Sequence, residues 1–248
     1  MGRAVAGHTA GLPATDAAGV LARLFPPFVA TALAPVGDEV PCSHPQERAA
    51  LAGAGPERRR QYLAGRACAH VALRAIGRDG LPLGRGSLGQ PLWPPGAVGS
   101  ISHTPDLAGA VAARTGDAWG LGFDLELLEP PLDAAVRRLV LRPDELARRA
   151  ASHPLDPHRA KIAFCVKECA YKCLSPGTRW PLDFHDLTVD VDLRRCRCRV
   201  VVDDRFRLGG LPLRPLDVRF AVVAGYVLAG LWVGSGGPPV CGDGRVTG

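Results

Sequence analysis

Two short stretches decide how this 248-residue chain is interpreted: residues 120–126, GLGFDLE, and residues 163–173, AFCVKECAYKC. The first predicts a strand whose end carries Asp124 and Glu126. Because alternate side chains of a strand point to the same face, both carboxylates project together. The second predicts a mostly apolar helix that nevertheless carries Lys167, Glu168 and Lys172. A strand end and a helix face therefore both present charges that need a physical explanation.

The two carboxylates, Glu168 and Lys172 form a candidate site for a metal ion and a phosphate. Two hard oxygen ligands side by side suit Mg²⁺, which proteins hold with one or two carboxylates and substrate phosphates. Glu168 and Lys172 are four residues apart on the helix and therefore lie on one face. On this hypothesis Glu168 completes a three-carboxylate metal site and Lys172 faces a phosphate. The alternative is a solvated strand end and an ordinary surface Glu–Lys pair, worth about 0.3–0.5 kcal/mol.

Basic side chains upstream form a candidate phosphate-binding group. They are Arg58, Arg59 and Arg66 on one predicted helix, Arg85 in a glycine-rich turn, and His103 just after a strand in GSISHT, residues 99–104. Guanidinium forks match the geometry of phosphate oxygens. The alternatives are a solvated basic face and a histidine that only makes structural hydrogen bonds.

Composition narrows the class of protein without naming the partner. A net charge of +6 indicates an anionic partner, which can be a nucleic acid, a polyanionic cofactor or an acidic protein surface. Aromatic residues make up only 6% and do not interleave with the arginines, which argues against a nucleic acid. No apolar run reaches the roughly 18 residues of a membrane span, and we find no signal peptide. We therefore expect a cytoplasmic protein that does not enter the membrane.

The eight cysteines do not predict a metal site. None forms a C-x-x-C pair, and this spacing argues against zinc. Cys165, Cys169 and Cys173 recur every four residues, which aligns them on one side of the predicted helix. We interpret them as buried, reduced thiols of a cytosolic protein.

The order of predicted elements favours an α+β fold with two similar halves, residues 1–122 and 123–248. Residues 1–18 are expected to be loosely packed. The predicted helices cover residues 19–24, 56–77, 132–150 and a segment that begins with Asp156 as cap and stops at residues 175–177. The predicted strands cover residues 28–34, 97–102, 107–114, 118–126, 187–193, 198–204 and 218–233.

The helix over residues 56–77 is bounded by Pro56 and Gly77, a start and a stop that suit a helix. Its apolar face is expected to consist of Leu63, Ala67, Val71 and Ala72. The residues expected on another face are Arg59, Arg66 and His70.

Read in order, several segments closely resemble the Sfp/EntD-type 4′-phosphopantetheinyl transferases. The segments are ERRRQYLAGRACAHVAL (57–73), GQPLWPPGAVGSISHTPDLAGAVAAR (89–114), GLGFDLE and FCVKECAYKCLSP (164–176). The most specific parts are G-x-D-x-E at residues 122–126 and [FW]-x-x-K-E-x-x-x-K at residues 164–172. The resemblance extends from about residue 48 to residue 190. Beyond it, the C-terminal segments agree with the family only in being predicted strands.

This resemblance implies a pseudo-twofold α+β fold with coenzyme A (CoA) between the halves. The enzyme would move 4′-phosphopantetheine from CoA to a serine of an apo acyl or peptidyl carrier protein and release adenosine 3′,5′-bisphosphate. By match to the motifs, Asp124, Glu126 and Glu168 would bind Mg²⁺, and Glu168 would also act as the base, directly or through a water. Lys172 would contact the pyrophosphate and offset charge on the leaving group. Members of this two-halved type are expected to be monomers.

The resemblance also assigns the basic residues to CoA. The residues that would grip its phosphates, the 3′-phosphate among them, are Arg66, Arg85, His103 and one of Arg58 or Arg59. Two departures concern the ligand sets: Leu125 offers no third ligand on the strand, and Leu88 stands where relatives often have a second cation. The carrier, whether from fatty-acid, polyketide, peptide or siderophore synthesis, stays open.

Two rival functions remain at this stage. One is a CoA-binding or carrier-docking module without transferase activity, although pure binding would not require Asp124, Glu126, Glu168 and Lys172 together. The other is a Mg²⁺-dependent phosphohydrolase acting on nucleotides, which the same carboxylates would allow. Hydrolysis of CoA without a carrier would favour the phosphohydrolase.

Overall fold

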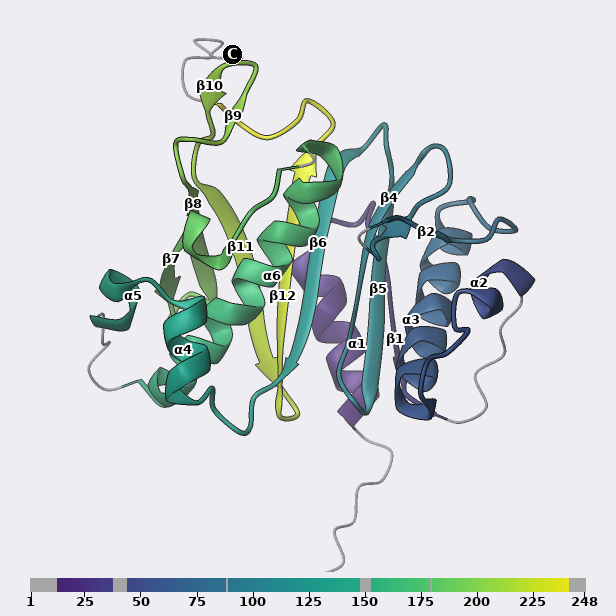
Figure 1. Ribbon diagram of the computed structural model, residues 1–248, viewed down its shortest axis with the longest axis horizontal. Coiled ribbons are helices and arrows are strands. Elements are labelled where there is room, and N and C mark those ends of the chain that lie inside the picture. Colours follow the sequence, from purple (N-terminus) through teal and green to yellow (C-terminus); the bar gives the residue numbers. More distant parts are fainter. Residues whose placement is uncertain (1–12, 38–43, 88, 148–152, 179, 241–248) are drawn as a thin grey trace, which may run out of the picture.

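The structure is a computed structural model that describes residues 13–37, 44–87, 89–147, 153–178 and 180–240. Two antiparallel sheets lie side by side, with helices packed on their faces (Figure 1). One sheet has the strand order β1-β5-β4 and the other the order β6-β12-β11-β8-β7. This arrangement confirms the predicted α+β class, with a long helix and antiparallel strands in each half.

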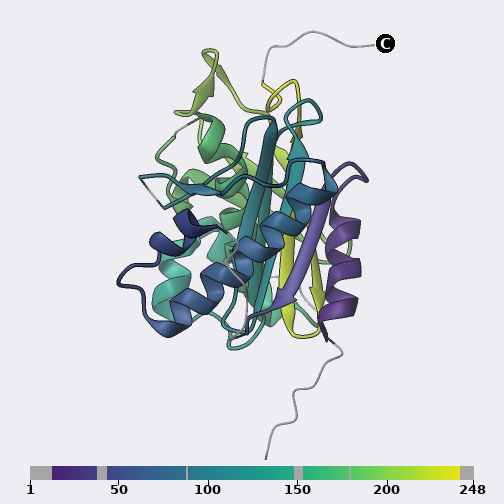
Figure 2. The same ribbon diagram turned by 90° about the vertical axis from the view of Figure 1, so that its right-hand side faces the viewer.

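The N-terminal half is built around α3, a helix of 20 residues that crosses its sheet (Figure 2). The elements are α1 (Pro13–Leu24), β1 (Ala30–Pro35), α2 (Pro45–Ala49), α3 (Pro56–Ala75), β2 (Gly84–Arg85), β3 (Pro91–Leu92), β4 (Ala97–His103) and β5 (Leu107–Arg114). β5 is the central strand and pairs with β1 and β4. The side chains of α3 and this sheet share one apolar core.

The C-terminal half is built around α6, which also has 20 residues. Its strands are β6 (Ala118–Leu127), β7 (Leu187–Asp192), β8 (Arg197–Val202), β9 (Arg207–Leu208), β10 (Leu211–Pro212), β11 (Leu216–Val223) and β12 (Tyr226–Gly234). Its helices are α4 (Ala134–Val140), α5 (Pro143–Ala147), α6 (Arg159–Thr178) and the 3₁₀ turns η1 (Asp156–His158) and η2 (Phe184–Asp186). α6 and α1 pack on opposite faces of this sheet.

β6 is buried on both faces and joins the two halves. Its Phe123 and Leu125 belong to the core that includes α1, whereas Gly122 and Asp124 face α6. The predicted boundary after residue 122 falls inside this strand, which pairs with β12 along residues 118–127. The division into residues 1–122 and 123–248 stays a prediction.

The predicted strands are confirmed, with small shifts at their ends. Residues 218–233 form a hairpin, β11 and β12, joined by Ala224 and Gly225 with φ values of 51° and 83°. Two consecutive residues with positive φ match the twist of a two-residue hairpin turn.

The predicted helices needed three corrections. α1 begins at Pro13 rather than near residue 19, so residues 13–18 are helical, while residues 1–12 lie outside the described residues. The helix expected over residues 132–150 is two short helices as far as residue 147, because Pro143 disfavours helical backbone in the residue before it; residues 148–150 lie outside the described residues. Asp156 opens a 3₁₀ turn rather than capping the long helix, which continues past Pro176 to Thr178.

The predicted apolar face of α3 was only partly right: Ala72 is buried, whereas Leu63 and Ala67 are partly exposed. Val71 is 55% exposed, and the side that packs on the sheet consists of Ala64, Gly65, Cys68, Ala69, Ala72 and Leu73. These are mostly small residues, which allow close approach: a Cβ on Gly65 would lie 2.9 Å from Ile101 Cγ2 on β4. Small residues therefore dominate that side, with Leu73 as its one large apolar member among those named.

Candidate active site

The glycine of the G-x-D-x-E motif determines how closely β6 approaches α6. A Cβ on Gly122 would lie 2.0 Å from the carbonyl oxygen of Cys169, and one on Gly120 would lie 2.7 Å from that of Cys173. Such distances cannot be relieved, because the opposing atoms are backbone. Only glycine permits this packing. Strand and helix are thus held close enough for Asp124 to meet side chains of α6.

Asp124 is the centre of a polar network that links three elements. Its Oδ1 accepts hydrogen bonds from Lys172 Nζ on α6 at 2.5 Å and from Ser102 Oγ on β4 at 2.7 Å. Lys172 also donates to Ser102 Oγ at 3.1 Å. Burial opposes the charge on Lys172, but the Asp124 carboxylate outweighs burial and raises the pKa of Lys172 above its usual range. The lysine is therefore a firmly charged ammonium at the seam between the halves.

Glu126 and Glu168 share the electrostatic field of Asp124. Burial, and then the negative charge of Asp124, raises the pKa of Glu126 to about 7, against opposing effects of Lys161 and Lys172. Burial also raises the pKa of Glu168, with Lys172 opposing and Asp124 adding to the shift. Carboxylates crowded in a half-buried site repel one another, and a bound cation would relieve that repulsion.

The carboxylate oxygens of Asp124, Glu126 and Glu168 do not lie as close together as the ligand atoms of a metal site do. Among the residues that the structure describes, the three ligand atoms that lie within 4.8 Å of one another belong to a different group: His44, Glu47 and His70. In the active site, Asp124 turns Oδ1 toward Lys172 and Ser102 instead. Its Oδ2 is buried and has no hydrogen-bond partner.

His103 and Arg58 form a pair at the end of β4. Arg58 Nη1 lies 2.8 Å from His103 Nε2. Burial, and then the positive charges of Arg58 and Lys172, lowers the pKa of His103 to about 4, so its ring is neutral at pH 7. A guanidinium can only donate, so Nε2 accepts and Nδ1 carries the ring hydrogen. Arg59 instead donates from Nε to the carbonyl oxygen of Ala54, at the start of its own helix.

Arg66 is a buried arginine that reaches the glycine-rich turn. Only 4% of it is exposed, its Nη2 lies 3.3 Å from the carbonyl oxygen of Gly84, and its guanidinium stacks over Tyr62 at 4.8 Å. Arg85 follows Gly84 on β2 and is exposed. Helix α3 and the turn at β2 thus present cationic groups that the sequence separates by about twenty residues.

Unsatisfied polar atoms concentrate at these residues. Five buried side-chain nitrogen or oxygen atoms in the described part of the chain lack a hydrogen-bond partner, and three of them are Arg66 Nη1, His103 Nδ1 and Asp124 Oδ2. The first two are donors and the third is an acceptor. Leaving buried polar groups unpaired costs about 1–3 kcal/mol each. Arg66 and His103 therefore offer donors suited to an anion, and Asp124 offers an acceptor suited to a cation.

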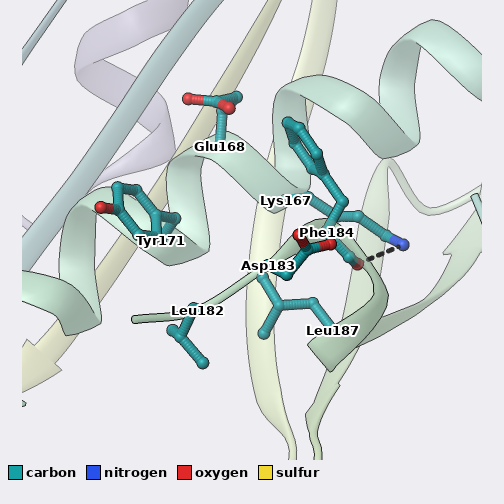
Figure 3. A pocket seen from close by; sticks show the side chains of 7 residues that line it. All are labelled: Lys167, Glu168, Tyr171, Leu182, Asp183, Phe184 and Leu187. Carbon is teal, nitrogen blue, oxygen red and sulfur yellow. Dashed lines mark hydrogen bonds between the residues drawn. The ribbon is translucent and has the colours of Figure 1, made fainter. Parts of the chain in front are cut away.

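A pocket opens beside Glu168, between α6 and the segment that follows it (Figure 3). The cavity measures about 180 Å³. The lining residues are Lys167, Glu168 and Tyr171 from α6 and Leu182, Asp183, Phe184 and Leu187 from the following segment. Its walls are mainly apolar, although three of the seven lining residues, Lys167, Glu168 and Asp183, are charged. A slender, largely uncharged chain would fit there.

Lys167, the other lysine of the motif, has a structural environment that the sequence did not predict. It is fully buried, and its Nζ donates to Glu145 Oε2 at 2.7 Å, to the carbonyl of Val140 at 2.8 Å and to that of Phe184 at 3.0 Å. Burial lowers the pKa of Lys167, and the hydrogen bond that Lys167 donates to Glu145 opposes that effect. Lys167 therefore ties α4, α5 and η2 to α6 and so fixes one wall of the pocket.

Sequence reasoning missed two residues of this region. Ser102 was noted only as a neighbour of His103, although it bridges Asp124 and Lys172. Glu145 drew no attention, because nothing local marks it as the partner of Lys167. The cysteines of α6 agree with expectation: Cys165, Cys169 and Cys173 are buried free thiols, and burial raises the pKa of each. Cys196, by contrast, is exposed. Cys42 and Cys241 lie outside the described residues.

Comparison with known proteins identifies the class. The model of the 4'-phosphopantetheinyl transferase N-terminal domain matches residues 46–113, and that of the 4'-phosphopantetheinyl transferase superfamily matches residues 120–207. Together the two matches include α3, β4, β6 and α6, the elements that carry the predicted site residues.

Individual relatives agree with the family models. The chain is 36% identical to 4'-phosphopantetheinyl transferase Svp of Streptomyces mobaraensis over 201 residues, 79% of this chain and 80% of the relative. It is 33% identical to 4'-phosphopantetheinyl transferase PptT of Mycobacterium tuberculosis over 193 residues, 75% and 84% of the two chains. Enterobactin synthase component D of Salmonella typhi is 36% identical over 132 residues, about half of each chain (53% and 54%).

The chain belongs to the 4′-phosphopantetheinyl transferase family, in agreement with the Sfp/EntD-type resemblance of its motifs. It transfers 4′-phosphopantetheine from CoA to carrier proteins. Across the described residues, every helix is too short or too polar to cross a bilayer.

Proposed function

We propose that this transferase works with Mg²⁺ held by Asp124, Glu126 and Glu168. Two observations support the fit: Asp124 Oδ2 is buried without a partner, and the pKa values of Glu126 and Glu168 are raised by burial and by the negative charge of Asp124. The donor set consists of carboxylate oxygens, which Mg²⁺ prefers. A bound Mg²⁺ would supply charge neutralisation on the pyrophosphate of CoA.

The phosphates of CoA are assigned to the basic residues of α3, β2 and β4. Arg66 Nη1 and His103 Nδ1 offer hydrogens that are not used within the protein. Arg58 is favoured over Arg59 for this role, because Arg58 lies at His103 whereas Arg59 is turned back to Ala54. Arg85 is exposed near Arg66 and is available for a third contact.

Lys172 and Glu168 carry the chemical roles. Lys172 is positioned by Asp124 and Ser102, stays charged, and offsets negative charge on the leaving group. Glu168 lies between the carboxylates and the pocket, where it would meet the incoming serine. The pantetheine arm of CoA is assigned to that pocket, whose apolar walls exclude water from the reacting groups.

These residues account for every bond formed and broken in the transfer and for the proton that is released. The carrier serine oxygen forms a bond to the phosphorus that bears the pantetheine. The bond from that phosphorus to the bridging oxygen breaks, and adenosine 3′,5′-bisphosphate leaves. The serine proton passes to Glu168, directly or through a water. Alignment and charge neutralisation supply most of the catalysis in such displacements.

The decisive observation is the juxtaposition of Lys172, Asp124 and Ser102 from three elements of both halves. Intact-mass spectrometry of an apo carrier protein, incubated with CoA and the enzyme, tests the proposal. We expect one phosphopantetheine to be added with Mg²⁺ and not with EDTA or with Glu168→Ala. A mass gain that survives both changes would overturn the metal and base assignments.

The same assay separates the rival functions. A CoA-binding module would retain CoA and leave every carrier unmodified, whereas a phosphohydrolase would cleave CoA without any carrier. The carrier panel should include acyl carriers of fatty-acid and polyketide synthesis and peptidyl carriers of peptide and siderophore synthesis. Siderophore carriers are included because one group of relatives is named enterobactin synthase component D, although those matches span about half of each chain. We further propose a cytoplasmic monomer, which light scattering can check.

A further inference from the structure

A second cluster of potential metal ligands lies in the N-terminal half, outside the active site. His44 is the residue that precedes α2, Glu47 lies in the first turn of α2, and His70 lies on α3. One ligand atom from each of the three lies within 4.8 Å of the other two. His70 follows Arg58 by twelve residues on the same helix, about 18 Å along its axis. Arg66, which is assigned to CoA, lies only one helical turn before His70, so the cluster adjoins that end of the CoA group and lies apart from Arg58.

The contacts within the cluster already orient its side chains. His70 Nε2 lies 2.8 Å from Glu47 Oε1, and the rings of His44 and His70 are 4.6 Å apart between centroids. The backbone N–H of Leu83 donates to Glu47 Oε1 at 2.7 Å. A carboxylate that ligates a metal is typically held by such an additional hydrogen bond. Helix α2, helix α3 and the turn before β2 thus converge on one carboxylate.

Exposure and charge also suit an ion from solution. Glu47 is only 2% exposed, whereas both histidines are half-buried and reach solvent. The ligand set therefore consists of one carboxylate and two imidazoles, with one side open to water.

We propose that His44, Glu47 and His70 bind a divalent transition-metal ion, with Zn²⁺ the ion that this donor set favours. Two histidines and one glutamate are a recurrent set of three protein ligands for Zn²⁺, with water in the fourth position. Imidazole also selects against Mg²⁺, which requires oxygen ligands. Ligands at 2.0–2.1 Å in a tetrahedron are about 3.3 Å apart, so side-chain rotations of modest size would complete the site.

The bound ion would link α2 to α3. α2 has only five residues and no side-chain cap at its start, so it needs tertiary contacts to persist. An ion held by both helices stabilises the folded state by its binding free energy. The argument against zinc from cysteine spacing does not apply here, because no cysteine takes part.

Zinc titration of the full-length, metal-stripped protein tests the proposal. Mg²⁺ is kept in large excess so that the active-site carboxylates do not compete. His44→Ala removes one ligand, and His70→Gln removes another while keeping a hydrogen-bond donor for Glu47. His185→Gln is the matched control, because His185 is exposed and lies elsewhere on η2. Calorimetry gives stoichiometry and affinity, and Co²⁺ absorption reports whether thiolates take part.

We expect one equivalent of Zn²⁺ to bind the wild type and the control. The affinity should fall at least about 100-fold in His44→Ala and in His70→Gln, since even partners behind the ligands change affinity by 10–100-fold. Zn²⁺ should raise the Tm of the wild type and not that of His44→Ala. Three results would overturn the proposal: no Zn²⁺ bound to the wild type, equal affinity in both variants, or a Co²⁺ spectrum with thiolate charge-transfer bands.

Discussion

The two lysines of α6 belong to one motif, five residues apart, and have opposite environments. Lys167 has no exposed surface, and its three ammonium hydrogens meet Glu145 and two carbonyl oxygens. The Lys172 side chain is 27% exposed, and its hydrogen bonds in the described structure go to Asp124 and Ser102. An ammonium has three hydrogens, so Lys172 keeps one for a ligand.

The difference teaches how one motif serves both architecture and chemistry. A fully satisfied, fully buried ammonium has nothing left to offer a substrate, and it holds the surrounding segments together. A partly exposed ammonium with only some of its hydrogens bonded is positioned and still available. The two lysines therefore predict different losses on mutation: stability for Lys167 and transfer rate for Lys172.

The largest expected effect comes from Lys167→Met. Glu145 would remain buried without its cation, which typically destabilises a protein by about 3–5 kcal/mol. Urea unfolding followed by circular dichroism measures the loss. The double variant Lys167→Met/Glu145→Gln, which removes both charges, should recover part of it. If Lys167→Met unfolds like the wild type, the buried pair does not hold the C-terminal half together.

Lys172→Met should act on the reaction instead. Removing one group that offsets charge in the transition state lowers turnover by about 10²–10³-fold. The change in unfolding free energy should stay below that of Lys167→Met, because water reaches this side chain and Ser102 still bonds Asp124. Initial rates of carrier modification at saturating CoA and Mg²⁺ give turnover. Wild-type turnover, or destabilisation equal to that of Lys167→Met, would contradict the contrast.

Gly122→Ala tests the close packing of β6 against α6, the helix that carries both lysines. The new methyl group would lie 2.0 Å from the Cys169 carbonyl oxygen, so β6 and α6 must separate. Overpacking of this kind destabilises by about 1–3 kcal/mol, and we expect turnover to fall as well because Asp124 moves from Lys172. Gly116→Ala is the matched control, since nothing lies within 4 Å of a Cβ there. Equal stability of the two variants would show that the contact between β6 and α6 tolerates a methyl group.

The smallest effect concerns pH and His103. Its folded-state pKa of about 4 is below the usual 6.5, so the unfolded chain binds more protons between these values. His103 therefore contributes stability above about pH 6.5, and this contribution is lost as pH falls toward 4. Tm measured from pH 7 to pH 4 should decrease less steeply for His103→Gln than for the wild type. Identical slopes would mean that His103 is not buried as a neutral ring.

Local patterns predicted much of the candidate site. Alternation placed Asp124 and Glu126 on one strand, and four-residue spacing placed Glu168 and Lys172 on one helix face. The glycine in G-x-D-x-E was recognised only as part of a motif. Its reason, the carbonyl of Cys169 facing position 122, becomes visible when β6 lies against α6.

Other features depend on contacts between distant parts of the chain. Ser102 and Lys172 are 70 residues apart, and Lys167 and Glu145 are 22 apart. No periodicity links such pairs, because their meeting depends on how the elements pack. The buried face of α3 was only partly predicted for a related reason: helical spacing marks apolar residues, whereas the close sheet selects small ones.

By itself the sequence determined the α+β class, the order of strands and long helices, and the motif residues that place the chain among the 4′-phosphopantetheinyl transferases. Those depend on spacing of two or four residues and on short motifs, which a linear chain displays directly. Tertiary structure alone decided that Arg58 rather than Arg59 meets His103, that Lys167 is architectural, and that His44, Glu47 and His70 meet. The physical reason is that side-chain partners are selected by packing between segments, and packing is a property of the whole fold.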